Sequence, residues 1–340
     1  MPKALPSLKP SPRVLQLCLA GEALCFGAKK LSLPPKNREE ISILHHAGVR
    51  QAVYVGTYVF ARFLKNRQNH NHDDNFLPIA LLYRHILDIG DSIAMLVRFD
   101  SVSSAAILLR ALFESVLSLR FLLEGNKFHN ERADCYWTSI KIKELEVATK
   151  GDPTTPEGKS IRQKMSPLGL SSPVTLQSYT EQRKQLEAEL DGESYREYWE
   201  RYKKAKKEKR PRAWYALCSK ANSLRDLAKL TGMEREYLMF YASLSEIAHA
   251  EDVITDLLHV KSLEQSVEVS VEKMRRPAGK VGRVAAITII FLLQMHETMQ
   301  ATYLNEDKKF TQMYQQWNRS YQRYYHWALS QDWKSHKKPF

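Results

Sequence analysis

The sequence predicts an all-α fold, a multi-helix bundle that carries a charged helical insertion. Apolar residues recur at helical spacing through most of its 340 residues, whereas the signals of strands are sparse. Glycine occurs only 13 times, and no Asn-Gly or Asp-Gly turn separates two alternating apolar runs. Because 44% of the residues are hydrophobic and 10% are aromatic, the chain can bury a sizeable core.

Changes in composition divide the chain into five segments. Prolines punctuate its start, and proline, glycine, serine and threonine accumulate again where the helical pattern stops. A highly charged stretch then precedes the return of apolar helices. The segments are an N-terminal arm at 1–36, a first half of the helical core at 37–150, a loop and charged helical insertion at 151–210, a second half of the core at 211–305, and an aromatic and basic C-terminal helix at 306–340.

Helical periodicity defines the first half of the core. Its first helix should begin after Asn37, whose side chain is suited to cap it. Two more helices, at about Leu77–Arg98 and Ser101–Glu124, are joined by so short a turn that we expect an antiparallel hairpin. Another helix runs through residues 131–150.

The insertion and the second half of the core differ in composition. Residues 151–180 contain four prolines and three glycines, which is typical of loops, and the charged residues that follow predict solvated helices. The core resumes at Trp214 and closes with an apolar helix at 284–304. Its apolar run from Val284 to Met295 is shorter than the roughly 20 residues that cross a bilayer, so we predict a buried helix and no membrane insertion.

Charge and cysteine usage limit the class of protein. The net charge of +13 predicts attraction to nucleic acid, acidic proteins or anionic membrane surfaces. The four cysteines form no C-x-x-C pair, and nothing else marks the chain as secreted. We therefore expect reduced thiols and a cytoplasmic location.

A first polar island, Arg110 and Glu114, interrupts the apolar pattern of residues 101–124. Four residues apart on a helix, the two side chains share a face and can pair. Apolar neighbours surround them, so we expect an internal helix. The pair either fixes the register of the helix as a structural ion pair, or Arg110 faces a pocket and binds an anion such as phosphate.

A second polar island, Tyr241, Ser245 and His249, has the same four-residue spacing and predicts one stripe on a helix. His249 can act as a general base, because histidine titrates near neutral pH. The alternative is a core histidine with satisfied hydrogen bonds. The candidate catalytic residues are His249, Arg110, Glu114, Ser245 and Tyr241.

No familiar motif for a cofactor or a metal centre is present. The chain lacks the P-loop, the dinucleotide-binding fingerprint, the zincin motif and the nucleophile elbow. Asp88 and Asp91 can join Glu114 around a divalent cation, but carboxylates at this spacing are common on solvated helix faces. We predict neither a metal nor a cofactor.

The densest basic patch is the run from Lys203 to Arg212. It predicts either a solvated helix end or a surface that makes salt-sensitive contacts with the phosphates of nucleic acid. Its candidate nucleic-acid-binding residues are Lys203, Lys204, Lys206, Lys207, Lys209, Arg210 and Arg212.

Aromatic residues recur at spacings of four and three in the C-terminal segment, at Phe310, Tyr314, Trp317, Tyr321 and Tyr324. This spacing is typical of a helix seam that packs against the core, a second subunit or another protein partner. Stacking on nucleic-acid bases is the alternative.

At its two polar islands the sequence resembles a bacterial helical family catalogued as a domain of unknown function, number 5677. The resemblance lies in an R-x-x-x-E helix, here Arg110 and Glu114, and a later Y-x-x-x-S-x-x-x-H helix, here Tyr241, Ser245 and His249. It implies an all-helical fold and supplies no activity. A remoter likeness is to the HEPN helical domains, many of which are toxins, RNA-cutting enzymes or phage-defence components. Their arginine and histidine share one helix, so here the fold must bring Arg110 to His249.

These observations support two hypotheses. In the first, the protein is directed to nucleic acid, above all RNA, and is a metal-independent ribonuclease or a toxin or phage-defence effector. His249 then removes the proton of a ribose 2′-hydroxyl while Arg110 stabilises the phosphate. In the second, it is a non-enzymatic interaction or regulatory subunit whose polar islands are structural and whose C-terminal aromatic helix is an interface.

Overall fold

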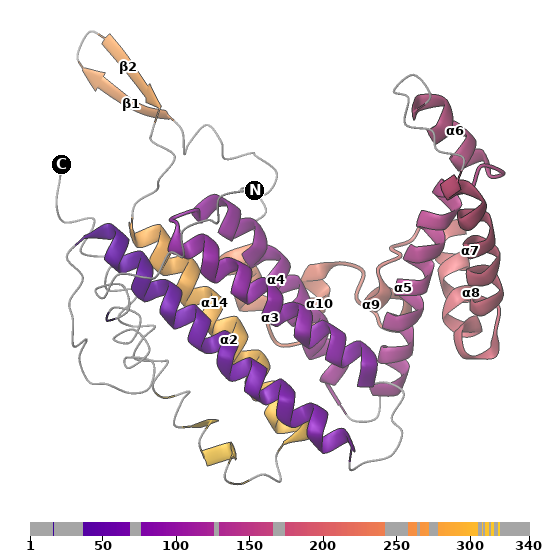
Figure 1. Cartoon of the computed structure of the whole chain (residues 1–340), viewed down its shortest axis with the longest axis horizontal. Coiled ribbons are helices and arrows are strands. Elements are labelled where there is room, and N and C mark those ends of the chain that lie inside the picture. Colours follow the sequence, from indigo (N-terminus) through magenta and orange to yellow (C-terminus); the bar gives the residue numbers. More distant parts are fainter. Residues whose placement is uncertain are drawn as a thin grey trace, which may run out of the picture. The chain divides into compact units, whose positions relative to one another are not determined.

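The computed structural model describes residues 37–68, 76–125, 129–165, 174–241, 258–263, 266–271 and 278–304, together with residue 16 and scattered positions between 308 and 319. The predicted all-α class is confirmed, with one two-stranded hairpin as the exception (Figure 1). Contacts divide the chain into two compact units. The first includes Ala80–Arg120 and the described residues up to 68 and from 234 on, and the second includes Phe121–Met233. The second unit spans more residues than the insertion expected at 151–210.

The first unit is built mainly from long helices. They are α2 (Arg38–Gln68), α3 (Phe76–Arg98), α4 (Val102–Leu123), the short α11 (Glu234–Glu236), the π-helical turn η3 (Tyr237–Tyr241) and α14 (Ala278–Tyr303), with the strands β1 (Leu258–Leu263) and β2 (Ser266–Val271). The outer ends of α3 and α4, up to Ile79 and from Phe121, belong to the second unit.

Helix α2 forms as its sequence predicts and lies along α14 (Figure 1). The Asn37 side-chain oxygen accepts a 3.0 Å hydrogen bond from the backbone N–H of Glu40, which confirms the predicted cap. Gly56 allows the two helices to approach closely. A Cβ atom there would lie 2.4 Å from Cε1 of His296 on α14 and 2.4 Å from Leu87 on α3.

A buried chain of hydrogen bonds joins α2, α3 and α14. The hydroxyl of Tyr83 lies 2.7 Å from Nδ1 of His296, and Nε2 of His296 lies 3.0 Å from the carbonyl oxygen of Ala52. Because a carbonyl can only accept, Nε2 carries the proton and Nδ1 accepts from Tyr83. Burial lowers the pKa of His296 to about 4, so the ring is neutral at physiological pH.

The turn between α3 and α4 is as short as predicted. Asp100 adopts a φ of 58°, and the backbone N–H of Ser101 donates to the carbonyl of Leu96 at 2.9 Å. The Asp100 carboxylate accepts a hydrogen bond from the hydroxyl of Ser42 on α2. This bond ties the turn to the first helix of the core.

The second unit contains six helices among its described residues. They are α5 (His129–Gly151), α6 (Pro156–Met165), α7 (Val174–Leu190), α8 (Glu193–Lys207), α9 (Trp214–Cys218) and α10 (Leu224–Leu230). Three of them share an apolar core made of Ile142, Leu145 and Ala148 on α5, Leu186 and Leu190 on α7, and Tyr202 on α8. The charge of α7 and α8 predicted helices that are solvated on all sides. Instead, each of them buries one face in this core.

Two local predictions were wrong. Residues 151–180 are not simply loop, because Thr155 accepts from the N–H of Gly158 at 3.0 Å and Pro156 occupies the first position of α6, where proline is favoured. Within the expected helical second half, β1 and β2 form an antiparallel pair in which Val260 faces Val269. Their alternating sequences carry a strand signal, but the two residues between them in the sequence, Glu264 and Gln265, are not a glycine-containing pair typical of hairpins.

The C-terminal aromatic segment contacts the first unit at its start. Phe310 and Tyr314 are both buried, at 2% exposure. The Phe310 ring stacks on Tyr58 of α2 with centroids 5.7 Å apart, and the Tyr314 hydroxyl donates to the carbonyl of Leu293 on α14 at 2.7 Å. These two rings pack against the core, one of the predicted roles. Trp317, Tyr321 and Tyr324 lie outside the described residues.

Helix α14 contains a segment, Val281–Tyr303, that is long and apolar enough to cross a membrane by length and composition alone. In its most apolar 18-residue window, 72% is buried within the structure. Core helices of globular units meet the same criterion, and the contacts of α14 with α2 give it that place here.

Candidate functional site

The first polar island gains a distant partner in the structure. Nε of Arg110 lies 3.1 Å from Oε1 of Glu114, as their spacing predicts, and Nη2 of Arg110 donates to the hydroxyl of Tyr241 at 2.9 Å. The Tyr241 hydroxyl donates in turn to Oε1 of Glu114 at 2.8 Å. Three side chains thus form a closed triangle across 131 residues of sequence, which we call the Arg110 cluster.

Helix α4 is not internal on all sides, contrary to expectation. Ser104 and Ile107 are exposed, and Arg110 and Glu114 continue the same side of the helix with side-chain exposures of 21% and 42%. The opposite side, including Phe113, is fully buried. The Arg110 cluster therefore lies at the edge of the core, where water and a ligand can reach it.

The π-helical turn η3 positions Tyr241. Its ring stacks on Tyr237 with centroids 4.9 Å apart and an interplanar angle of 19°, and it contacts Phe113 of α4 at 5.9 Å. The Arg110 guanidinium carbon lies 5.0 Å from the centre of the same ring. Isolated π-helical turns occur frequently at functional sites, because they realign side chains that an α-helix would place elsewhere.

In the Arg110 cluster, Arg110 and Tyr241 both keep their protons and donate to Glu114. Burial, followed by the hydrogen bond to Glu114, raises the pKa of Tyr241 to about 12. Burial alone would lower the pKa of Arg110, but its bonds to Glu114 and Tyr241 raise it. At neutral pH Arg110 is therefore charged and Tyr241 protonated, so neither acts as a base. The predicted base, His249, and its neighbour Ser245 lie outside the described residues.

The predicted basic run surrounds the C-terminal end of α8. Two of its residues are ion-paired, Lys203 with Glu200 and Arg210 with Glu208, each at 2.5 Å. Within the described part of the chain, the other five predicted residues have no carboxylate within ion-pair distance. These five are Lys204, Lys206, Lys207, Lys209 and Arg212.

A pocket opens beside this helix end. Its volume is about 260 Å³, and three cations line it, Arg201, Lys204 and Arg210. The remaining walls are apolar apart from Asn222. Arg201, which sequence analysis missed because it lies among acidic residues, donates to the carbonyl of Leu217 on α9 at 3.1 Å. We call Arg201 and the basic residues of the run from Lys203 to Arg212 the α8 basic surface.

Aromatic rings support the cations of the α8 basic surface. Trp199 and Tyr202 stack with centroids 5.6 Å apart and an interplanar angle of 14°. Nζ of Lys203 lies 5.1 Å from the Trp199 ring centre, and the Arg212 guanidinium lies 5.9 Å from that of Tyr202. Cations held over rings in this way are partly preorganised for an anionic ligand.

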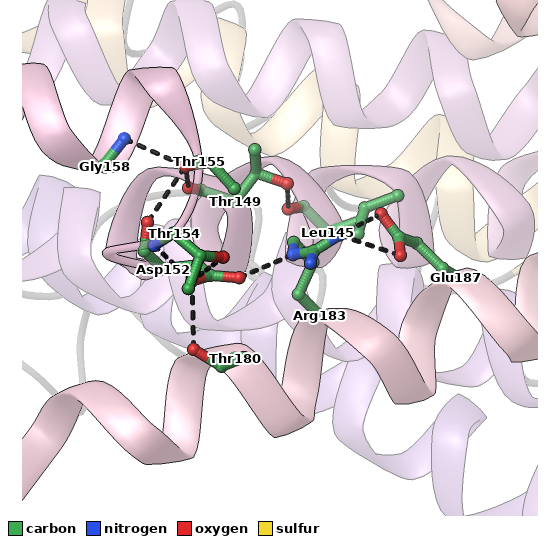
Figure 2. Close-up of polar contacts among 9 residues, drawn as sticks. All are labelled: Leu145, Thr149, Asp152, Thr154, Thr155, Gly158, Thr180, Arg183 and Glu187. Carbon is green, nitrogen blue, oxygen red and sulfur yellow. Dashed lines mark hydrogen bonds and ion pairs between the residues drawn. The ribbon is translucent and has the colours of Figure 1, made fainter.

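The second unit also contains a polar network that the sequence did not reveal. Asp152 is fully buried and accepts hydrogen bonds from Nε of Arg183 at 2.6 Å, from Oγ1 of Thr180 at 2.9 Å and from both N and Oγ1 of Thr154 at 2.8 Å (Figure 2). Nη1 of Arg183 also donates to Glu187 at 2.7 Å. Burial alone would raise the pKa of Asp152, but the bond from Arg183 and those from the threonines lower it. The bonds from Thr180 and Arg183 join the end of α5 to α7.

The acidic residues considered for a metal lie beside a groove between α2 and α3. Asp91 pairs with Arg50 at 3.1 Å, and Asp88 lies 3.9 Å from Arg84. The groove has a volume of about 400 Å³. In the described residues, no group of three or more metal-ligating side chains is present.

Both candidate surfaces lie within a region of the chain that matches a known protein family. The family of unknown function DUF5677 matches residues 76–266, more than half of the 340-residue chain. The chain belongs to this family. The DUF5677 region includes the Arg110 cluster and the α8 basic surface, whereas α2 and α14 lie outside it. No curated protein and no solved structure matches the chain.

Proposed function

We propose that this DUF5677 protein binds RNA through the α8 basic surface. The observation that carries the proposal is a set of exposed cations that have no ion-pair partner among the described residues, gathered at one helix end beside a cation-lined pocket. Lysines in ion pairs gain little from a phosphate, because they must give up a carboxylate, whereas these lysines exchange only solvent and counterions. The stacked Trp199 and Tyr202 add polarisable surface beside the cations.

A fluorescence-anisotropy titration with a labelled single-stranded RNA tests this proposal. We expect the variant Lys204→Ala, Lys206→Ala, Lys207→Ala to bind at least tenfold more weakly than the wild type, since it loses three phosphate contacts. The matched control is Lys159→Ala, Lys164→Ala, Lys184→Ala, which removes the same charge from exposed positions on α6 and α7.

Two outcomes contradict RNA binding at this surface. The wild type fails to bind RNA at low salt, or both triple variants lose affinity equally, which indicates a non-specific effect of net charge. Tighter binding of single-stranded DNA of the same sequence would redirect the proposal from RNA to DNA.

A second candidate function, RNA cleavage without a metal, is supported by the contact between the first polar island and Tyr241 of the second. Arg110 and Tyr241 belong to different islands, yet they are hydrogen-bonded. In this proposal His249 takes the proton of a ribose 2′-hydroxyl, whose oxygen attacks the adjacent phosphorus and displaces the 5′-oxygen of the next nucleotide. Arg110 stabilises the charge on the phosphate oxygens. The HEPN likeness belongs to this candidate, as does a role as a toxin or phage-defence effector.

Incubation with RNA in a chelating buffer distinguishes this candidate from a non-enzymatic interaction or regulatory subunit. Cleavage predicts fragments that end in a 2′,3′-cyclic phosphate, resistance of DNA, and loss of activity in His249→Ala with an unchanged circular dichroism spectrum. Intact RNA after incubation with the wild type would favour the non-enzymatic alternative.

A further inference from the structure

Two cysteines that are 83 residues apart in sequence come together in the second unit. The Sγ atom of Cys135 on α5 lies 3.1 Å from the carbonyl oxygen of Trp214, and Sγ of Cys218, the last residue of α9, lies 3.6 Å from the same oxygen. Both thiols therefore lie beside one backbone oxygen. Cys135 is buried and Cys218 is partly exposed.

The surroundings give the two thiols different chemistry. The neighbouring Cys218 thiol and burial raise the pKa of Cys135, so this thiol stays protonated and is protected from direct oxidation. Cys218 can be reached from solvent. A reagent in solution therefore meets Cys218 first and Cys135 only through Cys218.

We propose that Cys135 and Cys218 form a redox-active dithiol that a hydroperoxide converts to a disulfide. In the first step the Cys218 sulfur attacks one peroxide oxygen, the O–O bond breaks, and Cys218 becomes a sulfenic acid while the second oxygen leaves as water or alcohol. In the second step the Cys135 sulfur attacks the Cys218 sulfur, an S–S bond forms, and the hydroxyl of the sulfenic acid leaves as water with the Cys135 proton. One peroxide is reduced by two electrons, and the dithiol is oxidised by two.

The disulfide would join two helices of the second unit covalently. Its loop contains most of that unit, so the cross-link restricts the unfolded chain strongly. It also fixes α9, whose Ala216 and Leu217 line the pocket of the α8 basic surface. The proposal concerns the thiols alone and holds whether or not that surface binds RNA.

Mass spectrometry of peroxide-treated protein tests the proposal. The full-length chain with Cys18→Ala and Cys25→Ala contains only the two thiols in question. After hydrogen peroxide, unfolding and alkylation, we expect the mass to fall by two hydrogens, no alkylated cysteine, and one cross-linked peptide pair that dithiothreitol separates. The thermal midpoint should rise by roughly 5 °C or more and return on reduction.

A further substitution, Cys135→Ala, serves as the control. It should leave Cys218 to collect oxygen as a sulfenic or sulfinic acid, with no loss of two hydrogens and no rise in the midpoint. The proposal is overturned if, in the two-thiol protein, Cys135 remains alkylatable while Cys218 gains oxygen, or if both thiols stay reduced under conditions that oxidise free glutathione completely.

Discussion

Individual polar residues in this protein differ in how their charge is balanced. Arg110 is balanced by Glu114 at the edge of the core, where water still reaches both side chains. Asp152 is fully buried and is balanced by Arg183, whose side chain is 20% exposed. His296 avoids charge altogether by remaining neutral. The cost of disturbing each residue follows from this difference, because desolvation penalties grow with burial.

Removal of the Tyr241 hydroxyl tests the Arg110 cluster. We expect Tyr241→Phe to lower the free energy of unfolding by about 1 kcal/mol, since the ring stays packed and only the bonds to Arg110 and Glu114 are lost. In the described part of the chain, the hydroxyl of the neighbouring Tyr237 makes no hydrogen bond, so Tyr237→Phe is the matched control and should stay within about 0.5 kcal/mol of the wild type. Urea unfolding measures both variants, and equal losses would contradict the triangle.

The buried His296 predicts loss of stability in acid. Its pKa is about 4 in the folded protein and 6.5 when unfolded, so between these values the unfolded chain binds more protons. Stability should therefore fall as the pH drops from 6.5 to 4, by about 3 kcal/mol from this residue. Urea midpoints measured across this range should show a smaller fall for His296→Gln. The exposed His85→Gln serves as the control and should retain the full fall.

Residue pairs that lie within one helix are predictable from the sequence. Arg110 and Glu114 are four residues apart, and that spacing alone places them together. The bond from Arg110 to Tyr241, the Asp152 network and the Cys135–Cys218 pair depend on how helices pack. No local pattern encodes such packing. The sequence therefore did not predict the Asp152 network or the cysteine pair, and it left the contact between the two polar islands undecided.

Individual helices form where their ends and faces are well marked. Asn37 caps α2 as predicted, whereas the start of α6 was missed although Thr155 and Pro156 mark it. The charge of α7 and α8 concealed the apolar residues that each buries, such as Leu190 and Tyr202. For these helices, the average composition of a segment gave the wrong prediction, whereas single residues such as Pro156 and Tyr202 indicated the helix start and the buried face.

The crossing of α2 with its neighbours depends on Gly56. Replacement of a glycine by alanine in a helix normally stabilises it by about 1 kcal/mol. Here we expect Gly56→Ala to lower the free energy of unfolding by roughly 1–3 kcal/mol, because the new methyl group meets the fixed ring of His296. Thermal unfolding provides the measurement. As a control, Ala61→Gly on the exposed side of α2 should cost about 1 kcal/mol through helix propensity alone, and a stabilised Gly56→Ala would contradict the close crossing.

The link between α5 and α7 depends on Arg183. Arg183→Met leaves the buried Asp152 ionised with one donor fewer, so we expect the thermal midpoint to fall by roughly 5 °C or more. The double variant Asp152→Asn, Arg183→Met should recover part of the loss, because it removes the uncompensated charge. Lys184→Met, at the exposed next position, is the control. If the double variant is no more stable than Arg183→Met, the charge of Asp152 is not the cause.

Across the whole molecule, the net charge of +13 is concentrated rather than spread evenly. The run from Lys203 to Arg212 contains seven basic residues and one acidic residue, an excess of six. Fold class and the position of this run follow from the sequence, since periodicity and charge are properties of the chain itself. The pocket lined by Arg201 does not, because it requires α8 and α9 to meet.

The salt dependence of RNA binding tests the central claim most directly. For single-stranded nucleic acid, each phosphate contact contributes roughly 0.7 to the slope of log affinity against log salt concentration. We predict that Lys204→Ala, Lys206→Ala, Lys207→Ala reduces the magnitude of this slope by about 2, whereas Lys159→Ala, Lys164→Ala, Lys184→Ala leaves it unchanged. An equal slope for the two triple variants, or no measurable binding by the wild type, would contradict an RNA-binding role for the α8 basic surface.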